Sequence, residues 1–193
     1  HDWYLSANLT GSHNLGSHLL PGLEPKGVPR ELKGTVFPFK YNCIEELEEI
    51  IQLHDIGVIK MEVSRNSKPK DDFLIKVRKI ADDSNIVLIF DECTSGFRQT
   101  EGGLHKLYRV DPDMAVFGKA LGNGYAITAV IGRKDVMDCV QSTFISSTFW
   151  TERIGSVAAL KTLEVMNKSR SWDLITKIGF EIGNRWQSLG EKY

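Results

Sequence analysis

The sequence predicts an α/β fold, with a mostly parallel central sheet flanked by helices. Short apolar runs rich in Val, Ile and Phe alternate with longer segments whose apolar residues recur every three or four positions. The runs are typical of buried strands and the periodic segments of amphipathic helices, and their alternation builds βαβ units. The 193 residues are 41% hydrophobic and carry a formal net charge of -1, a composition that suits a globular domain with one sizeable core.

Composition argues against several classes of protein. No basic excess indicates a nucleic-acid partner, and no apolar stretch is long enough to cross a bilayer. The three cysteines, Cys43, Cys93 and Cys139, are odd in number and form no CxxC pair, which favours the cytosol over an oxidising compartment. The five histidines form no metal-binding motif, so no metal is expected.

The first elements are expected to be a loop and a helix. Most of the six prolines lie in the first 38 residues together with several glycines, and this density predicts a long loop. Asn42 is expected to cap the next helix, with Glu45 three residues later. The apolar stripe of that helix consists of Ile44, Leu47, Ile50 and Ile51.

Strands and helices then alternate along the chain. GVIKMEV, residues 57–63, is predicted to be the first strand, and a helix follows that is opened by Asp71 and Asp72, because acidic residues suit a helix N-terminus. Further strands are expected at 86–90 (IVLIF), 113–119 (DMAVFGK) and 126–133 (AITAVIGR). Further helices are expected near 103–109, in RKDVMDCV, and near 152–167 and 172–189.

The strand at 86–90 ends directly in two carboxylates, Asp91 and Glu92. Because carboxylates are seldom buried without a partner, a cationic group is expected beyond this end, where open α/β sheets bind ligands. A nucleotide-hydrolysing site would need GxxxxGK[ST], yet Lys119 is followed by Ala120. A dinucleotide site would need GxGxxG, yet GNGYAI places Ile127 at the third glycine.

A third interpretation uses Lys119, which ends the strand predicted at 113–119. If Asp91 and Lys119 lie at the same edge of one sheet, a carboxylate and an amine face one cleft. Pyridoxal phosphate (PLP) needs this pair, because the amine forms a Schiff base with its aldehyde and the carboxylate keeps the ring nitrogen protonated. On spacing alone, a surface or helix-start lysine remains the alternative.

Four stretches occur in an order that resembles a known family. They are LIFDECTSGFR, DMAVFGKALGNG, AVIGRKDVM and STFWTERIG, and they resemble the class-III aminotransferases of PLP fold type I, with the glutamate-1-semialdehyde aminomutase-like branch nearest. The resemblance implies pyridoxal 5'-phosphate as cofactor, a small-molecule amino donor, a keto or aldehyde acceptor, and a homodimer. It also implies the fold of a PLP-dependent transferase large domain.

The same resemblance implies roles for individual residues. Asp91 matches the acid that pairs with the pyridine nitrogen, and Lys119 matches the lysine that forms the Schiff base and moves the proton. Thr148 matches a threonine that reaches the cofactor phosphate of the neighbouring subunit. Glu62 matches a glutamate near the active site, although Val63 replaces the proline that normally follows it.

Glu92 and Arg98 match the loop after the acid-ended strand. Direct contact with the site and a supporting salt bridge are both open for these two residues. Gly122-Asn123-Gly124 stands where the family has a glycine triplet, and TERIG replaces the usual Ser-Gly-Asn-Pro. These departures leave open whether the reaction is a transamination or the intramolecular aminomutase reaction, and a non-catalytic PLP-binding homologue is a further alternative.

The resemblance also implies a domain organisation. The family's phosphate-binding loop and ring-stacking aromatic residue are expected before residue 1. Residues 1–170 are therefore expected to be part of the PLP-binding large domain, and residues 171–193 a helix that leads to a C-terminal small domain.

Overall fold

The computed structural model describes residues 2–11, 13–16, 18 and 22–193. The chain divides into two compact units, His1–Ile56 and Gly57–Tyr193. The first unit consists of short helices joined by loops: α1 (Asp2–Ser6), η1 (Ala7–Leu9), η2 (Arg30–Leu32) and α2 (Ile44–Leu53). The prediction of an uninterrupted loop over the first 38 residues was therefore wrong. The buried Asn8 side chain orders this region, because it donates to the Leu23 carbonyl (2.8 Å) and accepts from the Leu15 N–H (3.2 Å).

The start of α2 differs from the predicted capping pattern. Its N-cap is Cys43, whose side chain makes no capping hydrogen bond, while Asn42 has a left-handed backbone with φ 65°. The prediction of Asn42 as the cap was therefore wrong. Glu46 instead accepts hydrogen bonds from the backbone N–H (2.8 Å) and the Nζ (2.7 Å) of Lys40, which ties the first turn of α2 to the loop before it.

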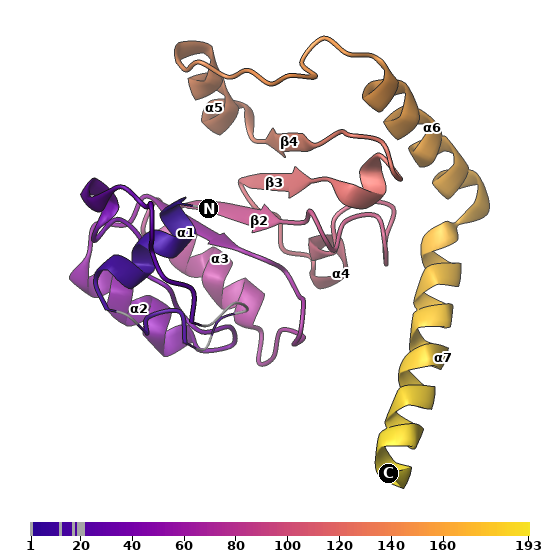
Figure 1. Ribbon diagram of the computed structural model, residues 1–193, viewed down its shortest axis with the longest axis horizontal. Helices are drawn as coiled ribbons and strands as arrows, with labels where there is room; N and C mark the ends of the chain where they lie inside the picture. The colour runs from indigo at the N-terminus through magenta and orange to yellow at the C-terminus, as the bar shows by residue number, and fades with distance from the viewer. Residues whose placement is uncertain (1, 12, 17, 19–21) are drawn as a thin grey trace. The chain divides into compact units, whose positions relative to one another are not determined.

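The second unit contains a four-stranded sheet in the order β1-β2-β3-β4 (Figure 1). The strands are β1 (Val58–Met61), β2 (Val87–Asp91), β3 (Met114–Phe117) and β4 (Ala129–Gly132). β1 and β2 are parallel, β2 and β3 are parallel, and β3 and β4 are antiparallel. This mostly parallel sheet confirms the predicted fold class. β3 ends two residues before Lys119, however, so the prediction that Lys119 ends the strand was wrong.

Helices of the second unit occur where the sequence predicted them, and η3 is an additional short helix that was not predicted. They are α3 (Phe73–Asp83), α4 (His105–Tyr108), η3 (Lys119–Leu121), α5 (Lys134–Met137), η4 (Asp138–Ser142), α6 (Ile154–Ser169) and α7 (Ser171–Lys192). In the described part of the chain, every helix is too short or too polar to cross a membrane. The predicted boundary after residue 170 falls where α6 gives way to α7, but the role of α7 as a lead to another domain stays a prediction.

One face of the sheet is buried and the other is partly exposed. Ile59, Leu88 and Phe90 point to the buried face, where Phe73, Leu74, Val77 and Ala81 of α3 are also buried. Because side chains alternate along a strand, Lys60 and Asp91 lie on the opposite face. The functional side chains of this sheet therefore lie on its less covered face and at its carboxyl edge.

Candidate active site

The carboxyl ends of β2 and β3 bring Asp91 and Lys119 to one edge of the sheet. Asp91 is the last residue of β2, and its register partner on β3, Val116, comes shortly before Lys119. The positive charge of Lys119 contributes to lowering the pKa of Asp91, so the two side chains interact electrostatically. The amine and the carboxylate therefore border the same region of space beyond the strand ends.

The carboxylate of Asp91 is held at both oxygens. Oδ2 accepts a hydrogen bond from Lys60 Nζ (2.7 Å), and Oδ1 accepts one from the Cys93 backbone N–H (3.1 Å). Burial by itself raises the pKa of Asp91, but the Lys60 ammonium, the Cys93 N–H and the charge of Lys119 outweigh it and hold the pKa below its ordinary value. Asp91 is therefore an anion at neutral pH, and a carboxylate can accept further hydrogen bonds beyond these two.

Lys119 lies on a sharp turn rather than on a strand. Gly118 is still extended, and Lys119 then opens η3 with a φ of 45°, a conformation that is uncommon outside glycine and that clusters at functional sites. Lys119 Nζ donates to the Thr94 hydroxyl at 2.6 Å. A Cβ on Gly118 would lie 2.9 Å from Cys93 Sγ, so glycine allows this turn to approach the loop after β2.

Two contacts of this site were not predicted from the sequence. Lys60 is the charged residue within the otherwise apolar run of β1, and this interruption was the available signal for a partner on β2. Thr94 carries no such signal, because a threonine in a loop is common. Only the fold of the loop brings its hydroxyl to Lys119.

Glu92 points away from the edge of the sheet and into the interior. It is completely buried and accepts hydrogen bonds from the backbone N–H and the Nδ1 of His105, both at 2.9 Å, and from the Ser95 hydroxyl. Burial raises its pKa, but the hydrogen bonds from His105 and Ser95 outweigh burial and hold the pKa below its ordinary value. Glu92 thus connects the end of β2 to the start of α4.

The remaining predicted site residues lie at different places. Arg98 Nε donates to the Thr94 carbonyl (2.6 Å), so Arg98 supports the residue that contacts Lys119. Glu62 follows β1 and pairs with Arg65 (3.1 Å). Thr148 is exposed in the turn before α6 and does not line the pocket beside Lys119. Its predicted contact with a neighbouring subunit stays a prediction.

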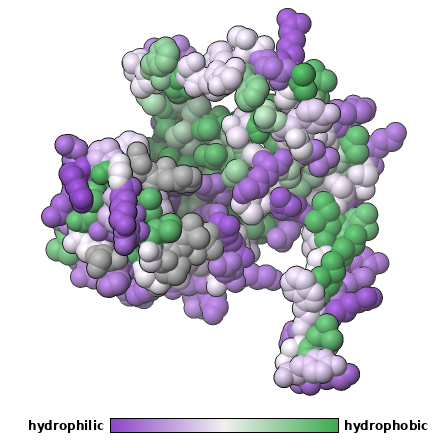
Figure 2. Space-filling model, viewed as in Figure 1, coloured by the Kyte–Doolittle hydropathy of each residue, from purple (hydrophilic) through white to green (hydrophobic). Residues whose placement is uncertain are grey.

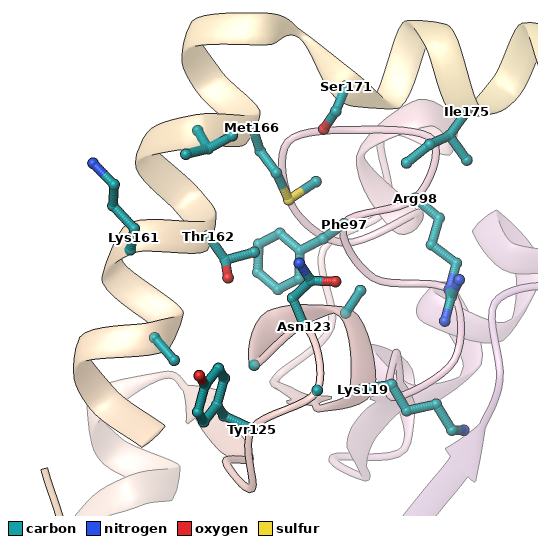
Figure 3. A pocket seen from close by; sticks show the side chains of 15 residues that line it. Phe97, Arg98, Lys119, Asn123, Tyr125, Lys161, Thr162, Met166, Ser171 and Ile175 are labelled. Carbon is teal, nitrogen blue, oxygen red and sulfur yellow. The ribbon is translucent and has the colours of Figure 1, made fainter. Parts of the chain in front are cut away.

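A pocket of about 750 Å³ opens beside the turn that carries Lys119 (Figure 3). Phe97 and Tyr125 line it together with side chains of α6 and α7, among them Met166 and Ile175, while Lys161 points away from it. The lining is therefore mixed, with apolar side chains beside the charged Arg98 and Lys119 and polar groups from Asn123, Thr162 and Ser171.

The turn at Gly122–Tyr125 explains why Asn123 is tolerated between two glycines. A Cβ on Gly122 would lie 2.2 Å from the Tyr125 carbonyl oxygen, and Gly124 has a φ of +106°, so both positions require glycine. Asn123 has a φ of 46°, a left-handed conformation that asparagine adopts more readily than most residues. Asparagine at position 123 thus suits the backbone of this turn.

Comparison with known proteins shows a consistent pattern. The family model described as aminotransferase class-III matches residues 66–193. A 3-aminobutyryl-CoA aminotransferase from Cloacimonas acidaminovorans is 35% identical over 175 residues, which are 86% of this chain and 42% of that protein. A glutamate-1-semialdehyde 2,1-aminomutase from Nitrosopumilus maritimus is 36% identical over 179 residues, 89% of this chain and 41% of that protein. The chain thus spans about two-fifths of the length of these curated relatives.

Solved structures show the same similarity. An omega-transaminase from Sphaerobacter thermophilus superimposes with a TM-score of 0.71 at 26% identity, over 86% of this chain and 41% of that chain. The FumI protein of Sphingopyxis sp. MTA144 gives a TM-score of 0.71 at 21% identity, over 86% of this chain and 44% of that chain, a likeness that shows the fold alone. The predicted fold, part of a PLP-dependent transferase large domain, is confirmed.

Proposed function

Because this chain belongs to the class-III aminotransferase family, as its sequence motifs predicted, we propose that the whole protein is a PLP-dependent enzyme that transfers an amino group. One observation carries the proposal: an amine, Lys119, and an ionised carboxylate, Asp91, lie at the carboxyl ends of two adjacent parallel strands. In open α/β sheets this edge is where ligands bind.

The groups at this edge fit the cofactor. An ionised carboxylate with acceptor positions to spare suits a protonated ring nitrogen, since charge-assisted hydrogen bonds are about twice as strong as neutral ones. Among the described residues, the hydrogen-bond partner of Lys119 Nζ is the neutral Thr94 hydroxyl. An amine in this place can join to the aldehyde of the cofactor.

Each residue of the site has a separate role in the proposed amino transfer. Bound PLP supplies an aldehyde that joins to amines and a ring that accepts electrons. In the proposed mechanism Asp91 would hold the ring nitrogen in its protonated form. Lys119 would hold the cofactor through its Nζ and would move a proton there as a general base and acid. The Thr94 hydroxyl orients that Nζ, and Arg98 supports Thr94.

A second candidate reaction is the intramolecular one, in which a single substrate is both donor and acceptor. The similarity to a glutamate-1-semialdehyde 2,1-aminomutase favours it, and the similarity to a 3-aminobutyryl-CoA aminotransferase favours ordinary transamination. A non-catalytic homologue is disfavoured, because such a protein would have no need of both Asp91 and Lys119.

The proposal also covers the oligomeric state, the partners and the compartment of the enzyme. We propose a homodimer with small-molecule substrates, in which Thr148 contacts the phosphate bound to the neighbouring subunit, and we propose no nucleic-acid or membrane partner. The three free cysteines, Cys43, Cys93 and Cys139, support the cytosol as its compartment.

Absorbance of the full-length protein tests the function. After addition of PLP, we expect a visible band that changes when an amino donor is added and returns when a keto acid is added. Glutamate 1-semialdehyde alone should cycle the band if the protein is an aminomutase. Lys119→Ala should lose the band, whereas the exposed Lys106→Ala should keep it. A wild-type band that responds to none of a broad panel of donors would contradict amino transfer.

A further inference from the structure

Lys60 and Asp91 form an ion pair across two neighbouring strands. Lys60 pairs in register with Ile89 on β2, and Asp91 is two residues further along the same strand, on the same face of the sheet. The Lys60 side chain is 58% exposed and that of Asp91 is 24% exposed. Lys60 thus reaches along the open face of the sheet to the carboxylate at its edge, over a contact of 2.7 Å.

The two hydrogen bonds on Asp91 come from different directions. Lys60 approaches Oδ2 from β1, along the open face of the sheet, and the Cys93 N–H approaches Oδ1 from the chain that follows β2. The torsion that rotates a carboxylate is soft, so one donor alone would leave the plane of the group free to turn. With one donor on each oxygen, the plane is fixed and each oxygen keeps an acceptor position.

We propose that Lys60 is a positioning residue, which holds the Asp91 carboxylate ionised and in one orientation, ready to accept a hydrogen bond from a protonated pyridine nitrogen. The inference deepens the proposed function and rests on it. Lys60 acts only through Asp91 and does not touch the cofactor. Without this role, an exposed pair of this kind would contribute little to the stability of the protein.

A competing interpretation is that Lys60 weakens the binding of PLP by charge repulsion. A cation beside Asp91 also repels the positive ring nitrogen, so Lys60 would weaken binding if both cations needed the same acceptor position. The acceptor capacity of Asp91 argues against this, because Lys60 Nζ takes one position on Oδ2 and the Cys93 N–H takes one on Oδ1, which leaves a further position on each oxygen. The charged groups that face Asp91 are Lys60 from β1 and Lys119 from η3, and both favour the ionised carboxylate over the burial that opposes it.

The effect of Lys60 on the titration midpoint of Asp91 is measured first, without cofactor. Carbon-13 NMR of labelled aspartate carboxyls in the full-length protein gives the titration midpoint of Asp91. We expect Lys60→Met to raise this midpoint and Lys60→Arg to restore it. Lys79→Met, which removes another exposed lysine-aspartate pair on α3, should leave it unchanged. An unchanged midpoint in Lys60→Met would overturn the proposal.

Binding of PLP is measured next, as a function of pH. Protonation of Asp91 removes the anion that the ring nitrogen needs, so Lys60→Met should release PLP at a higher pH on acidification than the wild type. At neutral pH it should bind PLP roughly three- to tenfold more weakly, because the carboxylate must be ordered on binding. Lys60→Arg should restore both properties, and Lys79→Met should match the wild type in both.

The outcomes separate the two proposals. Tighter binding by Lys60→Met would show competition and overturn the positioning role. Equal binding by Lys60→Met and the wild type at every pH would also overturn it, while leaving the proposed function intact. A wild type that binds no PLP, although Lys60→Met raises the Asp91 midpoint, would overturn the proposed function instead.

Discussion

The Asp91 carboxylate is partly buried, yet its pKa is lowered, because its hydrogen-bond donors stabilise the ionised form. The proposed role of this carboxylate depends on its negative charge, so Asp91→Asn is the direct test of that charge. We expect the fold to be kept and amino transfer to slow by several orders of magnitude, because a neutral amide cannot hold the proton on the ring nitrogen. Single-turnover kinetics of the full-length protein with a known donor measure this. A rate close to that of the wild type would mean that another residue protonates the ring.

Glu92 lies next to Asp91 in the sequence but serves the fold. Its carboxylate accepts three hydrogen bonds in the interior, and an amide oxygen cannot replace all of them. Glu92→Gln should therefore lower the free energy of unfolding by about 1–3 kcal/mol at neutral pH.

The difference between Glu92→Gln and the wild type should depend on pH. The pKa of Glu92 is lowered in the folded state, so its contribution is present above the pKa of the unfolded state and is lost as pH falls through the folded-state pKa. Urea unfolding at several pH values should show the difference shrinking on acidification. A difference that stays constant from neutral to acidic pH would show that the charge of Glu92 is irrelevant.

At the scale of elements, Asp113 joins three parts of the second unit just before β3. Its buried carboxylate pairs with Arg78 of α3 (2.9 Å) and Arg133 after β4 (2.8 Å), and it accepts the Leu88 N–H of β2 (2.7 Å). These contacts lie at the end of the sheet opposite to the proposed active site. They fix the positions of β2 and β3, and therefore the spacing of Asp91 and Lys119.

Asp113→Asn should destabilise the protein by about 2–4 kcal/mol, because it leaves two arginines without their shared anion. Asp82→Ala is the matched control, since it removes an exposed pair of the same Arg78 and should cost no more than about 1 kcal/mol. Chemical denaturation of both variants measures the contrast. Equal costs would show that the buried contacts of Asp113 do not matter more than the exposed pair.

The sequence located the elements of the second unit but not their ends. Apolar runs and helical periodicity depend on burial, which is a property of whole elements, so β1 to β4 were found at the expected places. The turn at Gly118-Lys119 was not found, because it is a left-handed conformation stabilised by the Lys119–Thr94 hydrogen bond. The cap of α2 was missed for the same kind of reason, since Asn42 has a left-handed backbone and the first turn of α2 is tied to the preceding loop by the Lys40–Glu46 contact.

The sequence predicted the main residues of the candidate site but not the contacts that support them. Asp91 and Lys119 each follow an apolar run, and the parallel topology of a βαβ unit implies that such ends share an edge. The Lys60–Asp91 pair depends on the register of β1 against β2, and no local pattern encodes that register. The inward turn of Glu92 likewise depends on His105, which lies beyond a loop.

At the scale of the whole molecule, the second unit exposes large apolar side chains. Several of them lie on α7 (Figure 2), where no residue is buried and Phe180 and Trp186 are 70% and 74% exposed. A contiguous apolar surface of this kind normally faces another protein surface. We therefore expect the 193-residue chain to self-associate in solution.

Light scattering and sedimentation over a range of concentrations measure this association. The double variant Phe180→Lys, Trp186→Lys should shift the distribution towards the monomer, whereas Lys177→Glu on the same helix should not. A wild-type chain that stays monomeric at every concentration would show that α7 is tolerated as an exposed helix.

Borohydride reduction of the full-length protein identifies the residue that would carry the cofactor, which we propose to be Lys119. Reduction of the full-length protein with bound PLP fixes the cofactor permanently to the amine that holds it, and peptide mapping then identifies that residue. We expect a pyridoxyl label on Lys119 in the wild type and no label at that site in Lys119→Ala. A label on Lys60 or on any other lysine, with Lys119 unmodified, would contradict it.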